Sequence, residues 1–173
     1  RIPGLAASLA LFMYVGLEMV LMQAFEVTLT LPGIAGIILS IGMAVDANVI
    51  IFTRIKEEIG AGNSVEKAIK SGFEKALSAI LDGNITTLIA AAVLYIRGSG
   101  TVKGFATTLA IGIIISLITA LFVTRGLLTA FFALGATNPK LYGIKKETKV
   151  INFIGFRRIA YSISSLVIIV GFI

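Results

Sequence analysis

Long apolar runs separated by short polar turns dominate the chain, and this pattern predicts membrane-crossing helices. A bilayer core about 30 Å thick requires about 20 consecutive apolar residues per helix. Four runs approach or exceed this length with few charges, at residues 5–25, 32–54, 77–96 and 104–124. The sequence therefore predicts an all-α, polytopic transmembrane bundle over residues 1–125.

The remaining residues divide into a linker and a further apolar run. Residues 126–158 are predicted to form a basic linker, and residues 159–173 the start of a fifth transmembrane helix. This last run is about 22 Å long as a helix, which is short of a full crossing. We expect the chain to be a fragment of a larger membrane protein.

An amphipathic stretch precedes the third apolar run. Glycines at 60 and 62 break the preceding helix, and Val65, Ile69 and Phe73 then recur at helical spacing. Lysines and glutamates occupy the other face. Residues 64–76 are therefore predicted to form an interfacial helix that leads into the membrane.

Composition and charge agree with a membrane protein. Hydrophobic residues make up 57% of the chain and charged residues 14%, against about 25% in ordinary soluble domains. The chain has no cysteine and no histidine, so thiol chemistry and the commonest metal ligand are missing. The net charge of +6 fits basic loops at one membrane face better than nucleic-acid binding.

The distribution of lysine and arginine predicts the topology. Arg1, the 54–77 loop and the 125–158 linker carry nearly all the basic residues, whereas the opposite side has only Arg97 and Lys103. Basic loops stay in the cytoplasm. The N-terminus, the 54–77 loop and the linker are therefore expected to be cytoplasmic.

Polar residues within the second and third runs are the candidates for chemistry. Asp46 lies about 21 Å beyond Pro32, where an unpaired charge costs several kcal/mol. A proton-relay role for Asp46, with Asn48 close by, is favoured over a neutral packing role. Asp82 and Asn84 form a second polar pair, which could line the same proton path or cap the third run. Glu18 is a third buried acid, to which we assign no role.

Two rows of small residues predict close helix packing. In lipid, small residues at three- and four-residue spacing let helix backbones approach closely. The predicted packing positions are Gly33, Gly36 and Ser40 in the second run and Gly104, Thr108, Gly112 and Ser116 in the fourth.

The chain lacks the phosphate-loop, zinc-protease and serine-hydrolase motifs, and an enzymatic activity or a cofactor is not expected.

Several long motifs resemble the SecD subunit of the bacterial protein-export machinery. They are LTLPGIAG at 29–36, GMAVDANV at 42–49, RIKEE at 54–58, AILDGNITTLIA at 79–90 and GFATTLAIG at 104–112. The tail NFIGFRR at 152–158 resembles the opening of SecF, which suggests a fused SecDF. The sequence departs from the family's pattern at Ser8 and Tyr14, where members often carry an Asp and an Asn, and it adds Glu18. Gly83 stands where alanine is more usual.

The resemblance implies a member of the resistance–nodulation–division superfamily with twelve helices in two related halves. Its proton-carrying aspartate falls on Asp46. It also implies a bacterial inner-membrane location and, as partners, the SecYEG translocon, an unfolded preprotein, protons, membrane lipid, the rest of the SecF half and an extracytoplasmic domain.

Three hypotheses follow. The leading one is a proton-driven accessory subunit of protein translocation. The others are a related exporter of lipids or small hydrophobic compounds, and a structural bundle that docks on the translocon.

Overall fold

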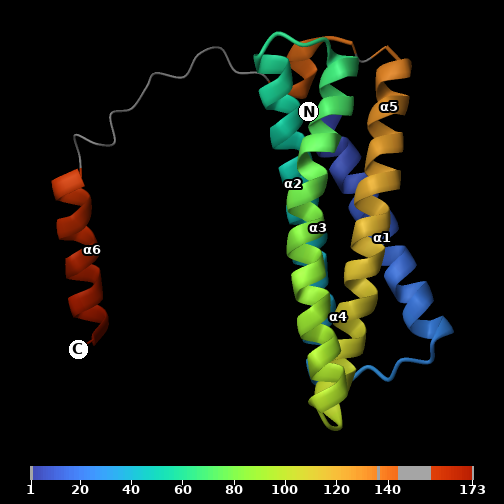
Figure 1. The fold of residues 1–173 in the computed structure, drawn as a ribbon, viewed down its shortest axis with the longest axis vertical. Coiled ribbons are helices and arrows are strands. Elements are labelled where there is room, and N and C mark those ends of the chain that lie inside the picture. Colours follow the sequence, from blue (N-terminus) through green and yellow to red (C-terminus); the bar gives the residue numbers. More distant parts are fainter. Residues whose placement is uncertain (1, 136, 144–156, 173) are drawn as a thin grey trace.

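The computed structural model describes residues 2–135, 137–143 and 157–172, and these are almost entirely helical (Figure 1). Three long helices come first: α1 (Ile2–Ala24), α2 (Leu31–Gly60) and α3 (Val65–Arg97). A fourth rod is made of α4 (Thr101–Ile118), the π-helical segment η1 (Thr119–Thr124) and α5 (Arg125–Ala133). The short 3-10 turn η2 (Pro139–Tyr142) and helix α6 (Arg157–Phe172) complete the described elements.

The predicted all-α bundle is confirmed. Four helical rods in the described part of the chain are long and apolar enough to cross a membrane. They run side by side in Figure 1, while α6 lies apart from them. Helix α6 contains a shorter apolar stretch, Ala160–Gly171.

Local sequence explains where the central helices begin. The Thr30 hydroxyl accepts a hydrogen bond from the Gly33 amide at 3.1 Å, and Pro32 occupies the first turn, where a missing N–H is not needed. At the start of α3, the Ser64 hydroxyl accepts from the Lys67 amide at 3.4 Å. Gly62, with φ of 90°, permits the tight turn between α2 and α3.

The predicted interfacial helix is not a separate element in the structure. Residues 65–76 are the first part of the continuous helix α3, and its apolar face is buried in protein. Val65, Ile69 and Phe73 pack in one cluster with Ile55 of α2 and Leu128 of α5. The amphipathic pattern indicated a buried face correctly, but it could not distinguish a membrane surface from neighbouring helices.

The fourth rod is longer than the sequence pattern predicted. It passes Arg125 without ending and continues to Ala133, so the first residues assigned to the linker are helical. Leu127, Leu128 and Phe131 maintain the helical spacing and pack against the same cluster as Ile55. The linker residues 136 and 144–156 lie outside the described part of the chain.

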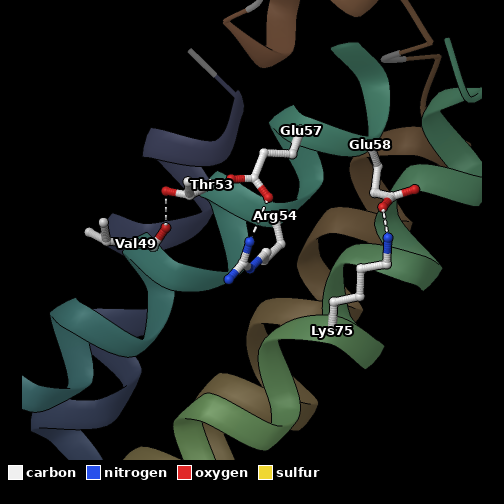
Figure 2. A network of polar contacts seen from close by, with 6 residues as sticks. All are labelled: Val49, Thr53, Arg54, Glu57, Glu58 and Lys75. Carbon is white, nitrogen blue, oxygen red and sulfur yellow. Dashed lines mark hydrogen bonds and ion pairs between the residues drawn. The ribbon is translucent and has the colours of Figure 1, made fainter. Parts of the chain in front are cut away.

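Helix α2 is the centre of the bundle and contacts α1, α3, α4 and η1. Near the α2–α3 turn, an ion pair between Glu58 and Lys75 joins α2 to α3, as Figure 2 shows. Within α2, Arg54 pairs with Glu57 at 2.8 Å (Figure 2). At the opposite end of the bundle, the Lys103 ammonium lies 5.6 Å from the centre of the Tyr95 ring.

Candidate functional site

Asp46 lies in the middle of α2 and faces a groove between α2 and α3. The groove has a volume of about 250 Å³, and α3 contributes Gly83, Asn84 and Thr87 to its wall. Asp46 also borders a second, more open groove along the face of α2 that carries Ile38 and Gly42. Within the described residues, the carboxylate makes no hydrogen bond or ion pair and is exposed. The acid is therefore available to a proton or to a partner outside this bundle.

Asn84 supplies a buried polar group in the same groove. Its amide nitrogen donates to the Ile80 carbonyl at 2.7 Å, which fixes the orientation of the side chain. Its Oδ1 is buried and has no hydrogen-bond partner among the described residues. Such an acceptor is costly to leave unsatisfied in an apolar environment, so the groove has a preference for a donor, which a protonated carboxyl or a water molecule would supply.

Asn48 lies only two residues after Asp46, on the opposite side of α2, and makes a different contact. It is 6% exposed, its amide nitrogen donates to the Ala44 carbonyl at 3.2 Å, and its Oδ1 accepts from the Thr124 hydroxyl at 2.8 Å. Thr124 is the last residue of η1, whose π-helical winding is a local departure from the α-helix. Asn48 thus holds α2 against η1.

Asp82 is exposed and does not line the groove that holds Asp46 and Asn84. Its backbone carbonyl accepts a hydrogen bond from the Thr86 hydroxyl at 2.8 Å. Of the four residues proposed for proton transfer from the sequence, the structure therefore brings Asp46 and Asn84 together. Asn48 and Asp82 lie elsewhere.

The two rows of small residues meet between α2 and α4. The Thr108 hydroxyl donates to the Gly33 carbonyl at 3.0 Å, which requires close contact of the helices. A Cβ added to Gly36 would lie 3.0 Å from the Phe105 carbonyl oxygen, and one added to Gly112 would lie 2.4 Å from the Ser40 Cβ. Gly104 faces Thr30, whereas the hydroxyl of Ser116 is buried with no partner among the described residues.

A buried polar cluster where α1 meets α2 was not predicted from the sequence. The Tyr14 hydroxyl donates to Ser40 Oγ at 2.8 Å, and Ser40 Oγ lies 3.0 Å from Glu18 Oε1. Glu18 is fully buried, and its Oε2 has no partner among the described residues. The spacing of Tyr14 and Glu18, one helical turn apart, was a signal that could have placed both on one face.

The described residues offer no metal centre at this site. The described residues contain no group of three or more carboxylate side chains placed to hold a metal ion. The polar groups that the groove offers are the carboxylate of Asp46 and the neutral amide of Asn84. No cation of the described residues pairs with Asp46, because the only ion pairs there lie near the α2–α3 turn.

Comparison with known proteins identifies the family. The profile of the family "Protein export membrane protein SecD/SecF, C-terminal" matches residues 3–133. The chain belongs to this family. The resemblance to SecD and SecF found in the sequence motifs is thereby confirmed.

Individual SecD proteins are similar to the chain over most of its length. The protein translocase subunit SecD of Acidaminococcus fermentans is 53% identical over 146 residues, which are 84% of this chain and 35% of that protein. The SecD subunit of a Synechocystis species is 57% identical over 128 residues, or 74% of this chain and 27% of that protein. The chain thus spans about a third or less of these relatives.

Two crystal structures of SecDF share the fold. One, of SecDF in a super-membrane-facing form, has a TM-score of 0.79 and 41% identity, covering 95% of this chain and 22% of that protein. The other is SecDF of Thermus thermophilus, described as a translocon-associated membrane protein. It has a TM-score of 0.78 and 39% identity, covering 96% of this chain and 23% of that protein.

Proposed function

We propose that this chain is part of an accessory subunit of the Sec protein translocase that uses proton flow to promote export. Family membership supports the role in export, because the similar proteins are translocase subunits and a translocon-associated SecDF. The partners that follow are the SecYEG translocon, an unfolded preprotein, the SecF half and an extracytoplasmic domain. The bacterial inner membrane is the corresponding location, with the α2–α3 turn in the cytoplasm.

The observation that carries the proposal is an acid in the middle of a membrane helix with no partner among the described residues. Asp46 lies 15 residues, or about 22 Å, after the first residue of α2. An ionised carboxylate at such a depth costs several kcal/mol unless it is paired or wet. Protonation removes this cost, so the equilibrium between two helix arrangements can depend on whether Asp46 carries a proton.

The protonation state of Asp46 determines which hydrogen bonds this side chain can make in the groove. A protonated Asp46 can donate a hydrogen bond toward the groove that contains the unsatisfied Asn84 Oδ1, whereas the ionised form can only accept. The ionised form instead favours a cation or water from outside the bundle. Alternation between these states would shift α2 relative to α3, and this shift is the proposed coupling step.

The test is Asp46→Asn in the full-length protein. The substitution retains size and hydrogen bonding but abolishes proton exchange, so proton conduction in proteoliposomes should be lost and preprotein export in cells should fall about tenfold or more. Export is measured by pulse-chase of a secreted preprotein. Asp82→Asn is the matched control, because Asp82 is an exposed acid outside the groove, and it should leave both readouts near wild type.

Unchanged proton conduction and export in Asp46→Asn would eliminate the proton-coupled mechanism. The chain would then act as a structural bundle on the translocon. Loss of both activities in the Asp82→Asn control as well would show that membrane acids are needed in general and would remove the specific role of Asp46.

A further inference from the structure

A long groove between α3 and α5 has a basic end and an apolar end. The basic end, of about 430 Å³, is lined by the N-cap residue Ser64 and by Lys67 and Lys70 of α3, together with Arg125 and Phe132 of α5. A larger space of about 780 Å³ continues from it, because Arg125 and Thr129 line both. Helices α3 and α5 lie next to each other at this end of the bundle (Figure 1).

The apolar end is built from large hydrophobic side chains. Phe73 and Leu77 of α3 face Leu121 and Phe122 of the fourth rod across this space. Phe122 is 73% exposed although it is fully apolar. This part of the groove has the dimensions and lining of a site for a hydrocarbon chain.

The basic end gathers three cations from two helices. Lys67, Lys70 and Arg125 are exposed, and none forms an ion pair with another described residue. Lys75, by contrast, already pairs with Glu58 (Figure 2). One acid, Glu66, lines the basic end, and a second, Glu74, lines the apolar end. The basic end therefore has an excess of positive charge that a bound anion would offset.

The position of this charge along the bundle matches the headgroup layer of a membrane. The apolar part of α3, residues 77–96, is about 30 Å long and spans the hydrocarbon core. Lys70 lies two turns before residue 77, or about 10 Å beyond the core boundary.

We propose that this groove binds one phospholipid with an anionic headgroup. Its phosphate lies among Lys67, Lys70 and Arg125, and an acyl chain extends along Leu77, Leu121 and Phe122. Basic pockets between membrane helices bind anionic headgroups in this way, and the Arg guanidinium suits phosphate in particular. The lipid bridges α3 and α5 as a resident ligand and is not a transported substrate. This site is independent of the proton-transfer proposal for Asp46.

The experiment is a lipid titration of the full-length protein, observed by native mass spectrometry in detergent. Phosphatidylglycerol and phosphatidylcholine with identical acyl chains are the two probes. One phosphatidylglycerol should bind with clear preference over phosphatidylcholine. Lys67→Gln combined with Lys70→Gln should weaken this binding, by about fivefold for each cation removed. Arg125→Gln should weaken it by a similar factor.

Two further variants separate the headgroup from the chain. Arg97→Gln with Lys103→Gln is the matched control, because it removes two cations from the opposite end of the bundle and should leave the preference unchanged. Phe122→Ala should weaken the binding of phosphatidylglycerol while its ratio to phosphatidylcholine remains the same.

Three results would overturn the proposal. The first is equal binding of the two lipids by the wild-type protein. The second is an equal loss of phosphatidylglycerol binding in the groove variants and in the Arg97→Gln, Lys103→Gln control. The third is full displacement of the lipid by millimolar inorganic phosphate, which would assign the site to a free anion. None of these outcomes depends on proton conduction, so the fate of the Asp46 proposal stays separate.

Discussion

At the scale of single residues, the bundle contains two acids in very different surroundings. Asp46 faces a groove and has no partner among the described residues. Glu18 is fully buried and takes part in a hydrogen-bonded cluster with Ser40 and Tyr14. The carboxylate of Asp46 is open to partners from outside the bundle, whereas that of Glu18 is enclosed and joins α1 to α2.

The first prediction concerns Glu18. Its buried Oε2 lacks a partner among the described residues, and a full charge there would cost several kcal/mol. Glu18→Gln keeps the size and a neutral hydrogen-bonding group, so the free energy of unfolding should change by less than about 1 kcal/mol. Glu18→Ala removes the bond to Ser40 and leaves a cavity, which should cost about 2 kcal/mol.

Both variants are compared by thermal unfolding of the full-length protein in detergent. A large loss of stability in Glu18→Gln, equal to that of Glu18→Ala, would mean that the site needs an ionised carboxylate. The cluster would then require a cation that the described residues do not supply.

At the scale of elements, helix α2 is held by close contacts on two sides. Toward α4, Gly36 and Gly112 allow the backbones to approach each other. Toward α3, Gly72 has the same role, since an added Cβ would lie 2.9 Å from the Ile55 amide nitrogen. The rows of small residues in the sequence indicated the first contact, whereas Gly72 stands alone and gave no signal.

The second prediction tests the close contact between Gly72 of α3 and Ile55 of α2. Gly72→Ala should destabilise the protein by about 1–3 kcal/mol, because the clash is with backbone atoms that cannot rotate away. Gly83→Ala is the control on the same helix, as an added Cβ there meets nothing within 4 Å. The control should be neutral or stabilising by up to about 1 kcal/mol, since alanine favours a helix. Equal effects of the two substitutions on the unfolding temperature would contradict the close contact.

At the scale of the whole bundle, one apolar cluster near the α2–α3 turn joins most of the elements. It includes Ala6 of α1, Ile55 of α2, Phe73 of α3, Leu128 of α5 and Tyr142 of η2. Tyr142 is fully buried, and its hydroxyl has no partner among the described residues. The short turn η2 therefore closes this end of the bundle by apolar packing.

The third prediction concerns how the stability of the protein depends on pH through the buried Tyr142. Burial raises the pKa of the Tyr142 phenol above its ordinary value of 10.0. A raised pKa in the folded state means that stability is constant below about pH 10 and falls as the pH rises through and beyond that value. Tyr142→Phe should remove this alkaline loss and stabilise the protein by about 1 kcal/mol at neutral pH, because no hydroxyl is left unsatisfied.

Unfolding is followed from pH 8 to 11 in the full-length protein. Tyr95→Phe, at a tyrosine that is 54% exposed, is the control for the general effect of high pH. A wild-type stability curve that runs parallel to that of Tyr142→Phe over this range would contradict the burial of the phenol.

The sequence by itself determined that the chain is a bundle of membrane helices and which family it belongs to. Runs of apolar residues long enough to cross a bilayer leave few other folds, because backbone groups in lipid must be satisfied within a helix. The motif around Asp46 marked this acid as the candidate for proton transfer, and that role stays a prediction. Apolar runs and motifs are made of residues that are close together in the chain, so they can be recognised without knowing the tertiary structure.

Only the tertiary structure decided which polar groups meet. It placed Asn84 beside Asp46 but turned Asn48 toward Thr124, and it enclosed Glu18 with Ser40 and Tyr14. It also showed that residues 65–76 pack against α2, and that the fourth rod continues past Arg125. An apolar helix face fits lipid and protein equally well, so its partner depends on how the helices rotate and pack against one another.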